Sequence, residues 1–112
     1  MAKMLYTPKS YSDCKVLLDR KNRDELKLGN NTWVRRGRCG DYYAIVLHNT
    51  EIVRFHSDGR IVLSNGGWQT LTTKDRINEF IPRGWIYQHK HNWYYIVKTG
   101  DVEIPFESGM EI

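Results

Sequence analysis

The chain has 112 residues, a formal net charge of +4, and 40% hydrophobic and 27% charged residues. This length and balance predict a single globular domain, 1–112, with one modest core. The chain contains no apolar run of membrane-spanning length and no signal-peptide pattern. We therefore expect a soluble, cytoplasmic protein that does not interact with a membrane.

The first predicted element is a helix over residues 11–21. Residues 1–9 show no clear periodicity, and we expect them to be loose. Ser10 is a suitable N-cap, and Asp13 falls in the first turn, where the helix dipole favours a negative charge. The apolar residues on one face of this helix are Tyr11, Cys14, Leu17 and Leu18.

An antiparallel meander is predicted next. Residues 21–25 form a charged break, and Gly29-Asn30-Asn31 is typical of a turn. The predicted strands cover residues 32–36, 42–48, 52–56 and 61–64. The second of these is almost wholly apolar, which indicates a strand covered on both faces. Asp58-Gly59 predicts a hairpin between the last two strands.

A tight turn and a tryptophan follow the meander. Gly66 and Gly67 permit positive φ or the close approach of another segment. Trp68 comes directly after them, and we expect this large side chain to plug the interior.

The stretch after Trp68 predicts a short capped helix. Thr72 is the predicted N-cap, and Asp75, three residues later, gives a spacing like that of a capping box. Ile77, Phe80 and Ile81 form one apolar stripe, and Pro82 ends the helix. A helix this short is marginal alone, so its stripe must pack on the strands.

A second antiparallel meander closes the chain. The predicted strands are 85–89, 93–98 and 102–107, with a hairpin turn at 99–101. Pro105 places the last strand at a sheet edge, and the tail from Ser108 is expected to be loose. The predicted fold class is therefore α+β: an N-terminal helix, a meander, a short helix and a second meander. One bent sheet and a partly open barrel remain alternatives.

Signatures of catalysis or metal binding are lacking. Cys14 and Cys39 form neither a disulfide framework nor a zinc pattern, and idle thiols are the simpler interpretation. The four histidines, at 48, 56, 89 and 91, have no partner at a diagnostic spacing. Neither a nucleophile elbow nor a phosphate-binding glycine loop occurs. We expect no metal, no cofactor and no catalytic residue, and an enzyme is the least favoured class.

Positive charge is concentrated in the first third of the chain. Residues 1–40 hold ten Lys/Arg against four Asp/Glu, a local charge of +6. Arg35, Arg36 and Arg38 follow Trp33 closely, and guanidinium groups beside an aromatic ring suit phosphates and bases. These four residues are candidate contacts to nucleic acid or a protein partner. The alternative is an ordinary solvated strand end.

Aromatic residues are numerous for a core of this size. The chain has four Trp and seven Tyr, so some must lie on the surface, where such residues are enriched at binding hot spots. Tyr87, Trp93 and Tyr94 are the further candidate contact residues. Alternatively, they are half-buried residues of a sheet.

Several stretches within residues 26–82 carry a family resemblance: Lys27–Trp33, Tyr43–Thr50, Gly59–Ile61, Gly66–Thr70 and Thr72–Asn78. Together they resemble a family of small proteins encoded by bacteriophages and prophages, most closely over GGWQT and TTKDRIN. The resemblance implies an accessory protein that acts by binding. It brings no established activity and no functional residue.

Two hypotheses of function follow. The first is a non-catalytic phage accessory protein that binds nucleic acid or a nucleoprotein through its basic and aromatic surface. The second is an anti-defence inhibitor, of the anti-CRISPR type, that binds a host protein. A small enzyme is the remote alternative, and an exposed edge strand could also pair with a second copy.

Overall fold

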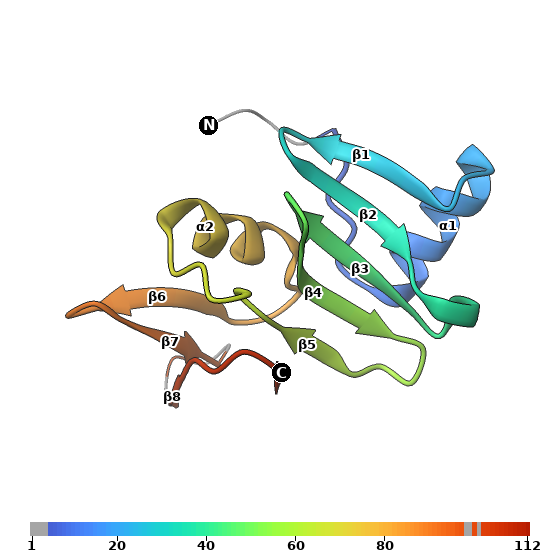
Figure 1. Cartoon of the computed structure of the whole chain (residues 1–112). Coiled ribbons are helices and arrows are strands. Elements are labelled where there is room, and N and C mark those ends of the chain that lie inside the picture. The colour runs from blue at the N-terminus through green and yellow to red at the C-terminus, as the bar shows by residue number, and fades with distance from the viewer. Residues whose placement is uncertain (1–4, 98–99, 101) are drawn as a thin grey trace.

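The chain folds as two α-helices and two antiparallel sheets in the computed structural model, which describes residues 5–97, 100 and 102–112 (Figure 1). The larger sheet has the strand order β1-β2-β3-β4-β5-β9, and the smaller one β6-β7-β8. The predicted α+β class and the order of helices and meanders are confirmed. The two meanders form separate sheets, so the described strands make neither one bent sheet nor a closed barrel.

The elements have the following bounds: α1 Tyr11–Lys21, β1 Glu25–Gly29, β2 Thr32–Arg36, the short 3-10 helix η1 Arg38–Gly40, β3 Tyr42–Leu47, β4 Thr50–His56, β5 Ile61–Leu63, α2 Leu71–Phe80, β6 Trp85–His89, β7 Asn92–Ile96, β8 Glu103–Pro105 and β9 Met110–Glu111. No helix in the described part of the chain is long and apolar enough to cross a membrane.

Helix α1 begins where its sequence predicts. Ser10 is extended, and its hydroxyl accepts a hydrogen bond from the backbone N–H of Asp13 at 3.0 Å. This bond satisfies one of the N–H groups that a first helical turn leaves without a partner. Cys14 and Leu18 are fully buried, so the predicted apolar face is confirmed.

Strand β1 was not expected, because its charged residues resemble a solvated break. Leu26 and Leu28 alternate with charged residues, and Leu28 is fully buried. The charged Glu25 and Lys27 lie opposite Arg35 and Trp33 of β2. A strand at a sheet edge can carry such charges on its open face while its alternate residues enter the core.

The N-cap of helix α2 lies two residues before the expected one, so the prediction of Thr72 as N-cap is wrong. Thr70 is the N-cap, and its Oγ1 accepts a hydrogen bond from the N–H of Thr73 at 3.2 Å. Thr72 and Asp75 therefore lie within the helix and form no capping box. Thr70, Thr72 and Thr73 can all cap in principle, and propensity alone does not choose among them.

The apolar stripe of α2 joins the two sheets. Ile77, Phe80 and Ile81 are buried, as expected, and α2 packs against β3, β4 and β6. A single core cluster includes these residues, Ile45 and Phe55 of the larger sheet, and residues of the smaller sheet. The helix that is too short to be stable alone is therefore held on both sides.

The C-terminal tail, expected to be loose, pairs with the larger sheet, whereas residues 1–4 of the other expected loose segment lie outside the described residues. Met110 and Glu111 pair with β5, and the N–H of Ile112 donates to Ile61 at 3.0 Å, so the expectation of a loose tail from Ser108 is wrong. Without this tail strand β5 would have an open edge, and the tail satisfies its backbone groups. Near the other end, Leu5 donates its N–H to Leu28 at 2.7 Å.

Candidate functional site

A pocket of about 530 Å³ opens between the β3–β4 hairpin and the start of α2. We call it the Trp68 pocket. It is lined by Leu47, His48, Asn49, Thr50, Ile52, Asn65, Trp68, Thr70, Thr72 and Thr73. Three of the stretches that carry the sequence resemblance, Tyr43–Thr50, Gly66–Thr70 and Thr72–Asn78, therefore meet at this one place.

Trp68 stands at the pocket wall and not inside the core. It is 63% exposed, so the prediction that it plugs the interior is wrong. Trp68 is the last residue of a four-residue turn, and its N–H donates to the carbonyl of Asn65, the first residue, at 2.8 Å. Gly66 and Gly67 both have positive φ, 61° and 87°, as a type I′ turn requires. This turn carries the ring away from the core.

The turn itself is fixed by side chains. The Asn65 Oδ1 accepts a hydrogen bond from the Gly67 N–H at 2.9 Å and another from the Ser108 hydroxyl at 2.9 Å. The Ser108 Oγ in turn accepts the Asn65 N–H at 3.1 Å. The returning C-terminal segment therefore helps to hold the backbone that presents Trp68.

Alanine at Gly66 is expected to destabilise the protein more than alanine at Gly67. Both residues have positive φ, which costs an L-residue about 1–2 kcal/mol. A Cβ at Gly66 would also lie 2.5 Å from the Cγ2 of Thr50, whereas a Cβ at Gly67 meets no heavy atom within 4 Å. Urea unfolding of Gly66→Ala and Gly67→Ala measures the difference. Equal losses would contradict the close approach to Thr50.

The rim of the pocket is polar and carries no carboxylate, lysine or arginine among the residues that line it. The side chains of His48, Asn49 and Thr72 form no hydrogen bond to any other described residue. Leu47 and Ile52 are buried, so they form the base. The pocket thus combines an apolar base, an aromatic wall and neutral donors and acceptors, the composition of many ligand sites.

The arginine cluster lies elsewhere, on β2 and η1, and strand geometry divides it. Arg35 lies opposite Ala44, and Arg36 lies opposite Tyr43, so their side chains occupy opposite faces of the larger sheet. Arg35 is exposed and 3.5 Å from a carboxylate oxygen of Glu25. Arg38 is exposed on η1 and, of the three, is the one that forms no ion pair with a described residue.

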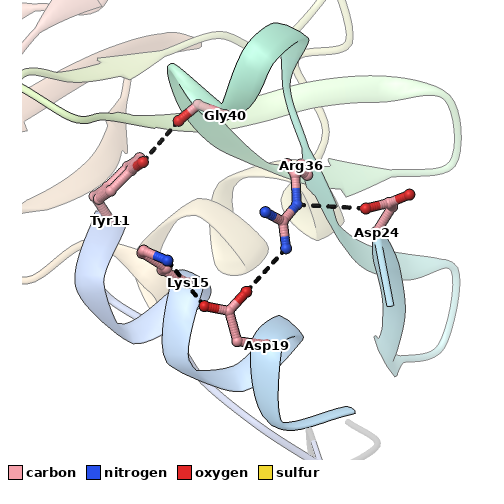
Figure 2. A network of polar contacts seen from close by, with 6 residues as sticks. All are labelled: Tyr11, Lys15, Asp19, Asp24, Arg36 and Gly40. Atoms are coloured by element: carbon pink, nitrogen blue, oxygen red, sulfur yellow. Dashed lines mark hydrogen bonds and ion pairs between the residues drawn. The ribbon is translucent and has the colours of Figure 1, made fainter. Parts of the chain in front are cut away.

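Arg36 joins β2 to α1 on the helix-covered face (Figure 2). Its Nη2 lies 3.0 Å from Asp19, and its Nε lies 3.4 Å from Asp24. Asp19 also accepts a hydrogen bond from Lys15 at 2.9 Å. Beside this network the Tyr11 hydroxyl donates to the carbonyl of Gly40 at 2.6 Å. Arg36 therefore has a structural role in docking α1.

Replacement of Asp19 by asparagine is expected to lower stability at neutral pH and to lose this effect in acid. Hydrogen bonds from Lys15 and Arg36 hold the pKa of Asp19 below its ordinary value of 3.8. A carboxylate with a depressed folded-state pKa stabilises the fold above its unfolded pKa. That contribution disappears as the pH falls through the folded pKa.

The measurement is the urea midpoint of the native protein and of Asp19→Asn between about pH 7 and pH 2. The difference between the two proteins should shrink below about pH 4. Asp41→Asn is the control, since Asp41 forms no ion pair within the described ranges. A difference that is independent of pH would contradict the network.

Trp33 lies on the face of the larger sheet opposite the helices, which we call the open face. It is half-buried, directly opposite Lys27 of β1 and Val46 of β3. Ala44 and Val46 on this face are buried, although they lie outside the core cluster. Larger neighbours such as Trp33 and Arg54 therefore cover them. Arg54 is itself paired, 2.6 Å from Glu51.

The aromatic candidates of the second meander lie on both faces of the smaller sheet. The rings of Tyr87 and Tyr94 are 5.6 Å apart on the outer face, which Trp85 shares. The Tyr87 hydroxyl donates to Glu103, which raises the pKa of Tyr87 to about 12. Trp93 is only 4% exposed and packs edge-on against Phe106, so it is a core residue.

The structure does not bring the two predicted groups of contact residues together. Figure 1 shows β6, β7 and β8 at one end of the molecule, and β1 and β2 at the other. Arg35 with Trp33, and Tyr87 with Tyr94, are therefore separate surfaces. Trp68, expected to be structural, lies in neither group. Its exposure depends on a turn whose direction local sequence does not specify.

The remaining reactive side chains that the structure describes lie apart from one another. Burial raises the pKa of the Cys14 thiol to about 12, so this cysteine is inert near neutral pH. Cys39 is exposed on η1. Within residues 5–97, 100 and 102–112, no group of three His, Cys, Asp or Glu side chains is arranged to hold a metal ion.

Comparison with known proteins identifies the family. Residues 13–112 match the family described as Kyanoviridae Gp96 protein, which accounts for nearly all of the described chain. No curated protein and no solved structure matches. The predicted resemblance to phage-encoded proteins is confirmed, and it extends beyond residues 26–82 to the C-terminus. The chain belongs to the phage-encoded Kyanoviridae Gp96 protein family.

Proposed function

We propose that this phage protein is a non-catalytic accessory protein that acts in the host cytoplasm by binding another protein through the surface around Trp68. The observation that carries the proposal is the exposure of two large apolar side chains close together in the sequence, the first of which lines a pocket. Trp68 is 63% exposed, and Leu71, three residues later, is 66% exposed. Tryptophan is the residue type most enriched among interface hot spots, particularly beside a pocket.

The chemistry of the pocket supports binding over catalysis. His48 is the one titratable side chain among the residues that line it. No lining carboxylate is available to orient or activate this histidine, and no lining thiol could act as a nucleophile. Neutral hydroxyl and amide groups beside an apolar base suit recognition.

The partner that we favour is a protein of the host. An anti-defence inhibitor would be one form of this function, in which the bound host protein belongs to a defence system. The basic side chains near α1 and β2 would then assist the approach of an acidic partner. Their charge would affect the rate of association more than the affinity.

The test is capture of a partner from nuclease-treated host lysate by the tagged full-length protein. A stoichiometric protein partner should be retained by the native protein and by Trp85→Ala. It should be lost with Trp68→Ala, because truncation of a hot-spot residue costs about 2 kcal/mol or more, roughly 30-fold in affinity. Trp85 is a matched control, since it is an exposed tryptophan outside the pocket. Equal retention by Trp68→Ala would refute the assignment of this surface.

A second candidate function is nucleic-acid binding through the open face. The observation in its favour is that Lys27, Trp33 and Arg35 share this face, where both a ring and cations can reach a single strand. The ion pair of Arg35 with Glu25 weakens this candidate, because a phosphate would have to displace the carboxylate. Fluorescence anisotropy with labelled single- and double-stranded oligonucleotides tests it. Binding should weaken steeply with salt and be reduced in Trp33→Ala.

A further inference from the structure

The Trp68 pocket has the dimensions of a site for one side chain and a short backbone segment. Its volume of about 530 Å³ falls within the range of roughly 300–1,000 Å³ typical of ligand pockets. Leu47 and Ile52 close its base, and both are buried in the larger sheet. A side chain that enters the pocket would therefore meet fixed apolar atoms below and the Trp68 ring beside it.

The neutral lining selects against charge. Asp, Glu, Lys and Arg are all lacking among the ten residues that line the pocket. A charged group that entered would lose its hydration and find no opposite charge, which is costly. An uncharged apolar group would lose nothing comparable. This difference provides specificity by rejecting the wrong ligand.

The rim has the groups needed to bind a peptide backbone. The side-chain amide of Asn49 and the hydroxyl of Thr72 form no hydrogen bond with the described residues. They come from two different elements that line the pocket, the β3–β4 hairpin and α2. A side-chain amide offers both a donor and an acceptor, as a peptide group requires. Leu71, the residue before Thr72, is an exposed apolar side chain.

We propose that the Trp68 pocket receives one uncharged apolar side chain from an extended segment of the partner, with Asn49 and Thr72 binding the adjacent peptide groups. This inference rests on the proposed function, in which the partner is a protein. It specifies the chemistry of the partner's anchor residue.

The test is an NMR titration of the full-length ¹⁵N-labelled protein with small probes at about 10 mM, tenfold above a Kd of about 1 mM. The probes are the N-acetyl amides of leucine, aspartate and lysine, and N-acetylglucosamine as a neutral ligand of another class. The leucine probe should shift the Trp68 indole signal and the amides of His48 and Thr72. The charged probes should bind at least about tenfold more weakly. Trp85→Ala should respond as the native protein does, and Trp68→Ala should not respond.

A substitution at the rim of the pocket provides a second test of the inference. Thr72→Asp places a carboxylate at an exposed position in the first turn of α2, where the helix dipole favours it, so the fold should be retained. This variant should bind the leucine probe more weakly and the lysine probe more tightly than the native protein does. Equal binding of charged and apolar probes, a response to N-acetylglucosamine alone, or no response at all would each overturn the inference. If the leucine probe binds as expected but no partner is captured from lysate, the proposed function is refuted and the chemistry of the pocket is not.

Discussion

Replacement of Phe80 by alanine is expected to cost about 3–5 kcal/mol of the free energy of unfolding, the range for truncating a buried phenylalanine. The side chain is fully buried in the one cluster that includes residues of both sheets. Its removal would leave a cavity at the junction, where α2 packs against β3, β4 and β6. Globular proteins are stable by only about 5–15 kcal/mol, so the loss would be at least about a fifth of the total.

Urea unfolding followed by circular dichroism measures this loss. Leu71→Ala is the control in the same helix, because Leu71 is 66% exposed and its truncation should change stability by no more than about 0.5 kcal/mol. The two variants also separate folding from binding: Leu71→Ala should impair partner capture without loss of stability. A similar loss of stability in both variants would contradict the assignment of α2 as the joint between the sheets.

Local sequence predicted the elements whose signals are short-range. The Ser10 cap and the apolar face of α1 were confirmed, as was the stripe of Ile77, Phe80 and Ile81. Strand β1 was missed because its charged residues resemble a break between elements. Its identity depends on pairing with β2, a contact that the sequence around Glu25 does not encode by itself.

The candidate site was harder to predict, and for two different reasons. Arg35 and Arg36 were grouped because they are adjacent, yet the two-residue period of a strand already places neighbours on opposite faces. The exposure of Trp68, by contrast, depends on the path of the Asn65–Trp68 turn and on the C-terminal Ser108 that holds it. No local pattern specifies such a long-range contact.

Replacement of Asn78 by alanine is expected to cost about 2–6 kcal/mol, because two backbone groups would lose their partners and each costs roughly 1–3 kcal/mol. The side-chain Nδ2 of Asn78 donates to the carbonyl of Ile86 at 2.8 Å, and its Oδ1 accepts the Ile86 N–H at 2.6 Å. β6 is an edge strand, and Ile86 is buried, so water does not easily replace these bonds. The amide thus takes the place of a neighbouring strand.

Asn78→Asp is the nearly isosteric comparison for this role. At neutral pH the carboxylate can still accept the Ile86 N–H, but it cannot donate to the carbonyl and would repel it. Repulsion raises the pKa of the introduced carboxyl in the folded state. The variant therefore gains stability relative to Asn78→Ala as the pH falls through that raised pKa, and the gain is complete at about pH 4, the unfolded value. Urea midpoints of the two variants across this range measure the gain. A constant difference would show that the amide's donor group contributes nothing.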